Sequence, residues 1–149
     1  MKETTRRREF LALAAALSAS FVTACAAAGV RPPAAGPEYA TERVSAHGAF
    51  RVSYATEGTI PVGRLHAWKL HVARTDGSPV TDAAIAIDGD MPEHRHGLPT
   101  RPRMTRNLGN GDYLVEGIKF QMGGWWVMDF DITAGGRTER ASFNLQLKK

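Results

Sequence analysis

The most apolar strand-like stretch of this chain reads Trp125-Trp126-Val127-Met128-Asp129-Phe130-Asp131-Ile132-Thr133. Side chains of an extended strand point alternately to its two faces. Asp129 and Asp131 therefore share one face, and the other face carries the apolar set Trp126, Met128, Phe130 and Ile132. A strand with one apolar and one mixed face is typical of an antiparallel sheet that covers a core on one side.

The same alternation recurs in shorter stretches, at residues 50–55, 66–73, 84–88, 113–120 and 141–147. Turn-forming residues separate these stretches, for example Asp76-Gly77-Ser78-Pro79 and Gly135-Gly136. Short strands with regularly spaced turns predict an all-β domain, an immunoglobulin-like antiparallel β-sandwich of about seven strands. A small barrel is the alternative architecture.

Residues 1–24 are predicted to be a signal peptide, because a basic region precedes an uncharged, mostly apolar run at residues 10–24. This run is shorter than the ~20 residues that a membrane-spanning helix needs. The sequence Arg7-Arg8-Glu9-Phe10-Leu11 matches the twin-arginine export pattern. A general secretion signal can also contain paired arginines and is the alternative route.

The single cysteine, Cys25, directly follows Val22-Thr23-Ala24 and completes a sequence that resembles a lipobox. Lipidation of Cys25 would anchor the protein in a membrane and would explain an unpaired cysteine in an exported chain. A buried or stray thiol is the other interpretation. Residue 26 is alanine rather than an inner-membrane retention aspartate. We therefore expect a periplasm-facing cell-envelope lipoprotein, in the outer rather than the inner membrane if the cell has both.

Residues 25–43 are predicted to be a lipid-anchored linker, because they are rich in alanine, glycine and proline. The folded domain is expected to span residues 44–149. The whole chain carries a net charge of +4, and the signal peptide accounts for part of this charge. The small remainder gives no basis for nucleic-acid binding.

One segment of the domain, Asp90 to Met104, is expected to be an irregular loop, since it contains three prolines and a glycine. It includes His94 and His96, whose imidazoles would point the same way in an extended chain. Imidazole and thioether ligands favour copper. Zinc is disfavoured because the domain has no cysteine. The predicted metal ligands are Met91, His94, His96, Met104 and Met122.

A structural role for these side chains is the competing interpretation: the histidines would hold the loop, and the methionines would fill gaps in the core. Trp125 shares its face with two aspartates and is a candidate binding surface, although it could simply cover a sheet edge. The sequence contains no nucleophile elbow, no His-Glu-x-x-His motif and no phosphate-binding glycine loop. We therefore do not expect an enzyme.

The order of several short motifs resembles the YtkA-like / FixH-like domain family of exported bacterial proteins. The motifs cover most of residues 58–134 and are Pro61-Val62-Gly63, Asp76 to Ala83, Met91-Pro92, Gly111-Asp112-Tyr113 and Phe120 to Trp125. The resemblance implies an immunoglobulin-like sandwich and an exported accessory or binding domain. FixH-like members are associated with copper supply to respiratory oxidases, but FixH has a membrane span where this chain has a lipobox.

Two functions from different classes follow. The first is an envelope lipoprotein that binds or delivers copper through its Met/His loop. The second is a module that binds an envelope protein or another ligand without a metal. The histidines would be exposed ligands in the first case and structural supports in the second.

Overall fold

A computed structural model of the chain describes residues 38–148. The predicted signal peptide, Cys25 and most of the predicted linker lie outside these residues. The described part contains nine strands, which are β1 (Glu42–Val44), β2 (Phe50–Thr56), β3 (His66–Arg74), β4 (Ala84–Met91), β5 (His96–Gly97), β6 (Arg103–Gly109), β7 (Asp112–Ile118), β8 (Gly124–Ala134) and β9 (Arg137–Leu147). Across residues 38–148, no helix is long and apolar enough to cross a membrane. Residues 38–148 form a compact unit with its own core.

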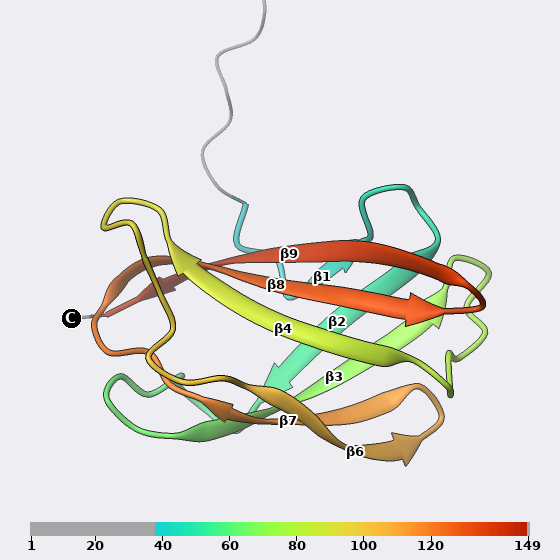
Figure 1. The fold of residues 1–149 in the computed structure, drawn as a ribbon, viewed down its shortest axis with the longest axis horizontal. Helices are drawn as coiled ribbons and strands as arrows, with labels where there is room; N and C mark the ends of the chain where they lie inside the picture. The colour runs from blue at the N-terminus through green and yellow to red at the C-terminus, as the bar shows by residue number, and fades with distance from the viewer. Residues whose placement is uncertain (1–37, 149) are drawn as a thin grey trace, which may run out of the picture. The chain divides into compact units, whose positions relative to one another are not determined.

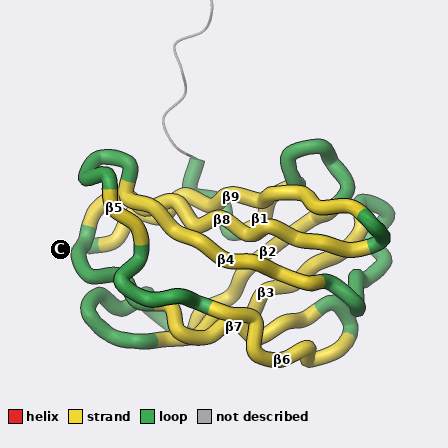
Figure 2. Tube along the Cα trace, in the orientation of Figure 1, coloured by secondary structure: helices red, strands yellow, loops and turns green. Residues whose placement is uncertain are grey.

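Two antiparallel sheets face each other in this unit (Figures 1 and 2). One sheet has the strand order β1-β2-β3-β7-β6, and the other has the order β5-β4-β8-β9. Without the two shortest strands, β1 and β5, the arrangement is the four-plus-three strand order of a constant-type immunoglobulin domain. The predicted β-sandwich is confirmed, and seven longer strands build it.

The alternation of the β8 sequence predicts its buried face correctly. Trp126, Met128, Phe130 and Ile132 are each 0% exposed. They face the core side chains of the other sheet, and the Trp68 and Phe130 ring centroids lie 6.2 Å apart. Burying side chains of this size contributes roughly 1.5–3 kcal/mol each, so the apolar alternation is the main source of stability.

Tyr113 in β7 ties the β3–β4 connection to the core. Its hydroxyl donates a hydrogen bond of 2.6 Å to the Val80 carbonyl and accepts one of 3.0 Å from the Ala83 amide. Tyr113 is fully buried, so these bonds replace the water that its hydroxyl would otherwise need.

The segment from Asp90 to Met104 is more regular than the sequence suggests. β4 continues to Met91, where Met91 pairs with His96 and Asp90 pairs with Gly97 to form a short hairpin. β6 then begins at Arg103. The expectation of one irregular loop was wrong because its prolines lie between the strands and therefore interrupt no hydrogen-bonded ladder.

Three connections meet at one end of the sandwich, on the left in Figure 1. They are residues 57–65 between β2 and β3, residues 92–95 between β4 and β5, and residues 119–123 between β7 and β8. The Gly63 amide donates to the Phe120 carbonyl at 2.7 Å, and the Gln121 side chain bonds to His96 at 3.0 Å. We call these three connections the loop end.

Candidate functional site

The β4–β5 turn places two histidines at the loop end. Pro92 follows the last residue of β4, and its fixed φ suits the first position of a turn. The amides of His94 and Arg95 both donate to the Met91 carbonyl, at 2.9 and 3.0 Å. Arg95 has a φ of 53°, which turns the chain back into β5. The turn is therefore closed by its own backbone.

The imidazoles of His94 and His96 lie side by side, with ring centroids 5.8 Å apart and planes inclined by 29°. His94 is exposed and His96 is half-buried. His96 also packs on the buried indole of Trp126, at a centroid distance of 5.7 Å. The pair thus combines one histidine fixed against the core with one that is free to turn. A metal–imidazole bond is about 2 Å long, so one ion can bind a nitrogen from each ring once His94 turns.

Gln121 holds His96 from the β7–β8 bend. Its amide nitrogen lies 3.0 Å from His96 Nδ1 and 3.3 Å from the Gly97 carbonyl oxygen. With Nδ1 as the acceptor, the proton of a neutral His96 lies on Nε2. If the amide is turned over, its oxygen accepts from Nδ1 and leaves the Nε2 lone pair for a metal.

Met91 lies behind His96 rather than on the surface. It is 1% exposed, and it pairs across the hairpin with His96. A Cβ added to Gly124 would collide with the methyl group of Met91. Met91 is therefore a core side chain directly beneath the turn.

The structure separates the two remaining methionines. Met122 is 39% exposed at the loop end, next to Gln121, and its carbonyl accepts a hydrogen bond of 3.1 Å from the Trp126 indole. Met104 instead pairs with Val115 in the other sheet and lines a groove beside Ile85 to Asp88. It faces the middle of β4, several residues before the histidine turn. Of the five predicted ligands, the structure brings His94 and His96 together with Met91 behind them. It places Met122 in the neighbouring β7–β8 connection and Met104 in the other sheet.

No carboxylate of the described residues joins His94 and His96 to form a three-ligand metal site. Within residues 38–148, no three side chains of histidine, cysteine, aspartate or glutamate lie close enough to hold one metal ion. An ion bound by the two imidazoles would therefore complete its coordination with ligands of another kind, such as a thioether, a carbonyl oxygen or water. A thioether ligand would favour a soft ion.

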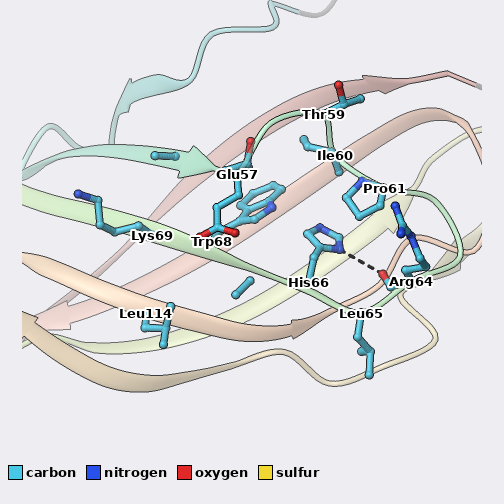
Figure 3. A pocket seen from close by; sticks show the side chains of 13 residues that line it. Glu57, Thr59, Ile60, Pro61, Arg64, Leu65, His66, Trp68, Lys69 and Leu114 are labelled. Atoms are coloured by element: carbon cyan, nitrogen blue, oxygen red, sulfur yellow. Dashed lines mark hydrogen bonds between the residues drawn. The ribbon is translucent and has the colours of Figure 1, made fainter.

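The loop end also contains a pocket of about 590 Å³ beside the β2–β3 connection (Figure 3). Ile60, Pro61, Leu65 and Trp68 supply apolar surface to it, and Glu57, Arg64 and Lys69 add charged groups. Leu65, which lines the pocket, is 67% exposed. The pocket has room for a small molecule or for a side chain of a partner protein.

Two buried polar atoms beside this pocket have no partner among the described residues. They are His66 Nε2 and Trp68 Nε1. The other ring nitrogen of His66 lies 3.2 Å from the Arg64 carbonyl, so Nδ1 carries the proton and Nε2 is an acceptor (Figure 3). Burial lowers the pKa of His66, and its bond to the Arg64 carbonyl only partly opposes that shift. A neutral imidazole acceptor and an indole donor are therefore buried beside the pocket.

A comparison with protein-family models matches residues 50–130 to the YtkA-like family. These residues make up more than half of the chain and include β2, β3, β4, β6, β7 and the first part of β8. The chain belongs to the YtkA-like family. The resemblance drawn from the short motifs is thereby confirmed.

No curated protein matches the YtkA-like chain. Among solved structures, it is similar to the Lin-41 filamin domain, with 11% identity, a TM-score of 0.42, and coverage of 64% of this chain and 91% of that chain. It is also similar to the ZirS C-terminal domain, with 12% identity, a TM-score of 0.38, and coverage of 99% and 88%.

Trp125, the predicted binding surface of the YtkA-like domain, lies half-buried on the outer face of β8. Its indole donates a hydrogen bond of 2.9 Å to the Asn144 side chain of β9. The indole therefore spans two neighbouring strands, which leaves less of it available to a ligand.

Sequence reasoning did not identify Gln121 or Trp126 as neighbours of His96. Trp126 has the pattern of a core residue, and nothing in a period-two pattern shows which strand end lies next to which loop. The pocket beside His66 was also missed. Pro61 and the exposed Leu65 were its only signals in the sequence.

Proposed function

We propose that this protein is a lipid-anchored cell-envelope protein whose YtkA-like domain binds a copper ion and hands it on. The observation that supports this best is the adjacent pair of imidazoles, His94 and His96, with ring centroids 5.8 Å apart on an accessible turn. The lipid anchor on Cys25 rests on the sequence alone. The protein acts as a carrier or buffer rather than as an enzyme.

Cu(I) is the ion that this donor set suits best. His94 and His96 would supply nitrogen ligands. Met122 would supply sulfur: it is exposed and directly follows Gln121, whose side chain contacts His96. Cu(I) accepts such soft, low-coordinate sites, whereas zinc prefers thiolate or further nitrogen and oxygen ligands. Gln121 would orient His96, as the outer partner of a metal-bound imidazole usually does.

A Cu(I) competition titration on residues 26–149 tests this proposal. We expect about one equivalent to bind, and the combined variant His94→Ala with His96→Ala to lose at least tenfold in affinity, about 1.4 kcal/mol. Met122→Leu keeps the size of the side chain and should weaken Cu(I) more than Cu(II). His47→Ala, on the exposed β1–β2 turn, is the matched control and should bind like the parent. Equal binding by the double variant would show that the site is wrongly assigned.

The pocket beside Trp68 favours a second candidate, a module that binds a small ligand or a partner side chain without metal. Its unpartnered His66 and Trp68 nitrogens are the supporting observation. A bound hydroxyl group could donate to one of them and accept from the other. This function would be insensitive to a copper chelator and to the loss of His94 and His96. Leu65→Asp would disturb it instead.

A further inference from the structure

Strand β4 lies at the margin of its sheet and is largely unpaired on one side (Figure 1). β8 covers one edge of β4 from Ala84 to Asp90. On the other edge, β5 pairs only with Asp90 and Met91. The edge from Ala84 to Asp88 therefore has no hydrogen-bonded partner strand within residues 38–148, although β6 of the other sheet lies nearby. Edges of this kind are usually protected, because they can pair with another chain.

The backbone groups on this open edge can be assigned from the hairpin. The Gly89 carbonyl accepts a hydrogen bond of 3.1 Å from the Leu98 amide, so the backbone N–H and C=O groups of Gly89 point away from β8. Backbone groups alternate along an antiparallel strand, so those of Ile85 and Ile87 point the same way. Neither residue has another backbone or side-chain partner among the described hydrogen bonds outside the strand ladders. Together they offer two N–H donors and two carbonyl acceptors.

A groove of about 470 Å³ runs along the open edge. The larger apolar residues that line it are Ile85, Ile87, Pro102 and Met104. Thr100 lines the same groove, and its hydroxyl is buried without a partner among the described residues. Unpaired backbone, apolar side chains and an unsatisfied hydroxyl thus occur together, which is the surface that an added extended strand would complete.

The far wall of the groove is basic. Arg101 and Arg103 line it and are exposed, and no carboxylate of the described residues forms an ion pair with either. Glu116 lies opposite Arg103 across the β6–β7 ladder but accepts a hydrogen bond from Thr105 instead. Asp88 is the one carboxylate that lines the groove. The charge of this wall therefore complements an acidic ligand.

We infer that the open edge of β4 binds an extended acidic segment of a partner protein. The segment adds as a strand against Ile85 and Ile87, places alternate apolar side chains over Ile87 and Met104, and sets its carboxylates against Arg101 and Arg103. This surface is separate from the histidine turn and does not depend on copper.

The probe is a synthetic peptide, acetyl-Glu-Val-Glu-Val-Glu-Val-Glu-amide, added at millimolar concentration to copper-free residues 26–149. Amide hydrogen exchange is followed residue by residue. We expect the Ile85 and Ile87 amides to exchange about tenfold more slowly, because a free edge amide becomes hydrogen-bonded. A matched peptide with lysine in place of glutamate should protect them far less, and one with a central proline should not protect them.

The combined variant Arg101→Glu with Arg103→Glu should reverse the preference, so that the lysine peptide now protects Ile85 and Ile87. Arg74→Glu, outside the groove, should leave the preference unchanged. Equal protection by both peptides, or protection at other strands only, would overturn the proposal. If the Ile85 and Ile87 amides became protected at higher protein concentration without peptide, the proposal of a partner protein would be overturned. The edge would then pair with a second copy of this chain.

Discussion

Gly124 shows how one missing side chain shapes the candidate site. Gly124 has a φ of 130°, a region that other residues rarely adopt, and the Met91 methyl group occupies the space where its Cβ would be. Because Met91 pairs with His96, the packing at Gly124 also determines what lies beneath the histidine turn.

At this scale we predict that Gly124→Ala destabilises the domain by about 1–3 kcal/mol, since an extra methyl group overpacks a filled core and strains the backbone. Met91→Ala alone should cost about 2–5 kcal/mol through the cavity that it leaves. Urea unfolding of both single variants and the double variant gives the coupling free energy between Gly124 and Met91. We expect the double variant to be less destabilised than the sum, and simple additivity would contradict the contact.

The distribution of buried residues could be predicted at the scale of single residues, but their neighbours could not. The alternation in β8 identifies Trp126 and Phe130 as core residues, because period two has a direct physical meaning. It cannot show that Trp126 supports His96, or that Met104 faces β4 rather than the histidines. Those contacts depend on which strands are adjacent, and this information is spread over the whole chain.

Among the structural elements, the β1–β2 turn is held by a buried carboxylate from β9. Glu139 is 5% exposed and accepts hydrogen bonds from the Ser45 hydroxyl and from the amides of Ala49 and His47. The Ser45 bond is the largest cause that lowers the pKa of Glu139, and the two amides add to it against the opposing effect of burial.

This arrangement makes the stability of the turn dependent on pH. A carboxylate whose pKa is lower in the folded state stabilises the protein above its unfolded pKa, about 4.3. That contribution disappears as the pH falls through the lower, folded pKa. We predict that Glu139→Gln is less stable than the parent at pH 7 and that the difference narrows toward pH 3. Urea unfolding at several pH values measures this, and a constant difference would contradict it.

The positions of β2 to β4 and β7 to β9 follow from patterns that the sequence displays, namely alternation and turn residues. The position of β6 does not, because nearly all of its residues are exposed and show no alternation of buried and exposed positions. The two short strands do not, because two or three residues carry no periodic signal. β5 pairs only because the turn at Pro92 returns the chain alongside β4. A local sequence pattern cannot predict a strand such as β5, which is defined only by its hydrogen bonds to β4.

For the whole molecule, the proposed anchor predicts where the protein is found. Cys25→Ser should abolish incorporation of labelled fatty acid and move the protein from the membrane fraction to the soluble envelope fraction. The variant should still bind Cu(I) like the parent, because Cys25 is not one of the proposed copper ligands. Fractionation with a fatty-acid label tests this, and unchanged membrane association of the variant would argue against lipidation.

The shortness of β5 bears on how quickly an ion could leave. Two residue pairs join β5 to β4, whereas β8 and β9 pair along their whole length. Small units at the margin of a fold open at a lower free energy than the whole molecule does. Opening of this hairpin would separate His96 from Gln121 while the sandwich stays intact. The residence time of a bound ion would then be set by the lifetime of one short hairpin, so cargo could be exchanged many times without global unfolding.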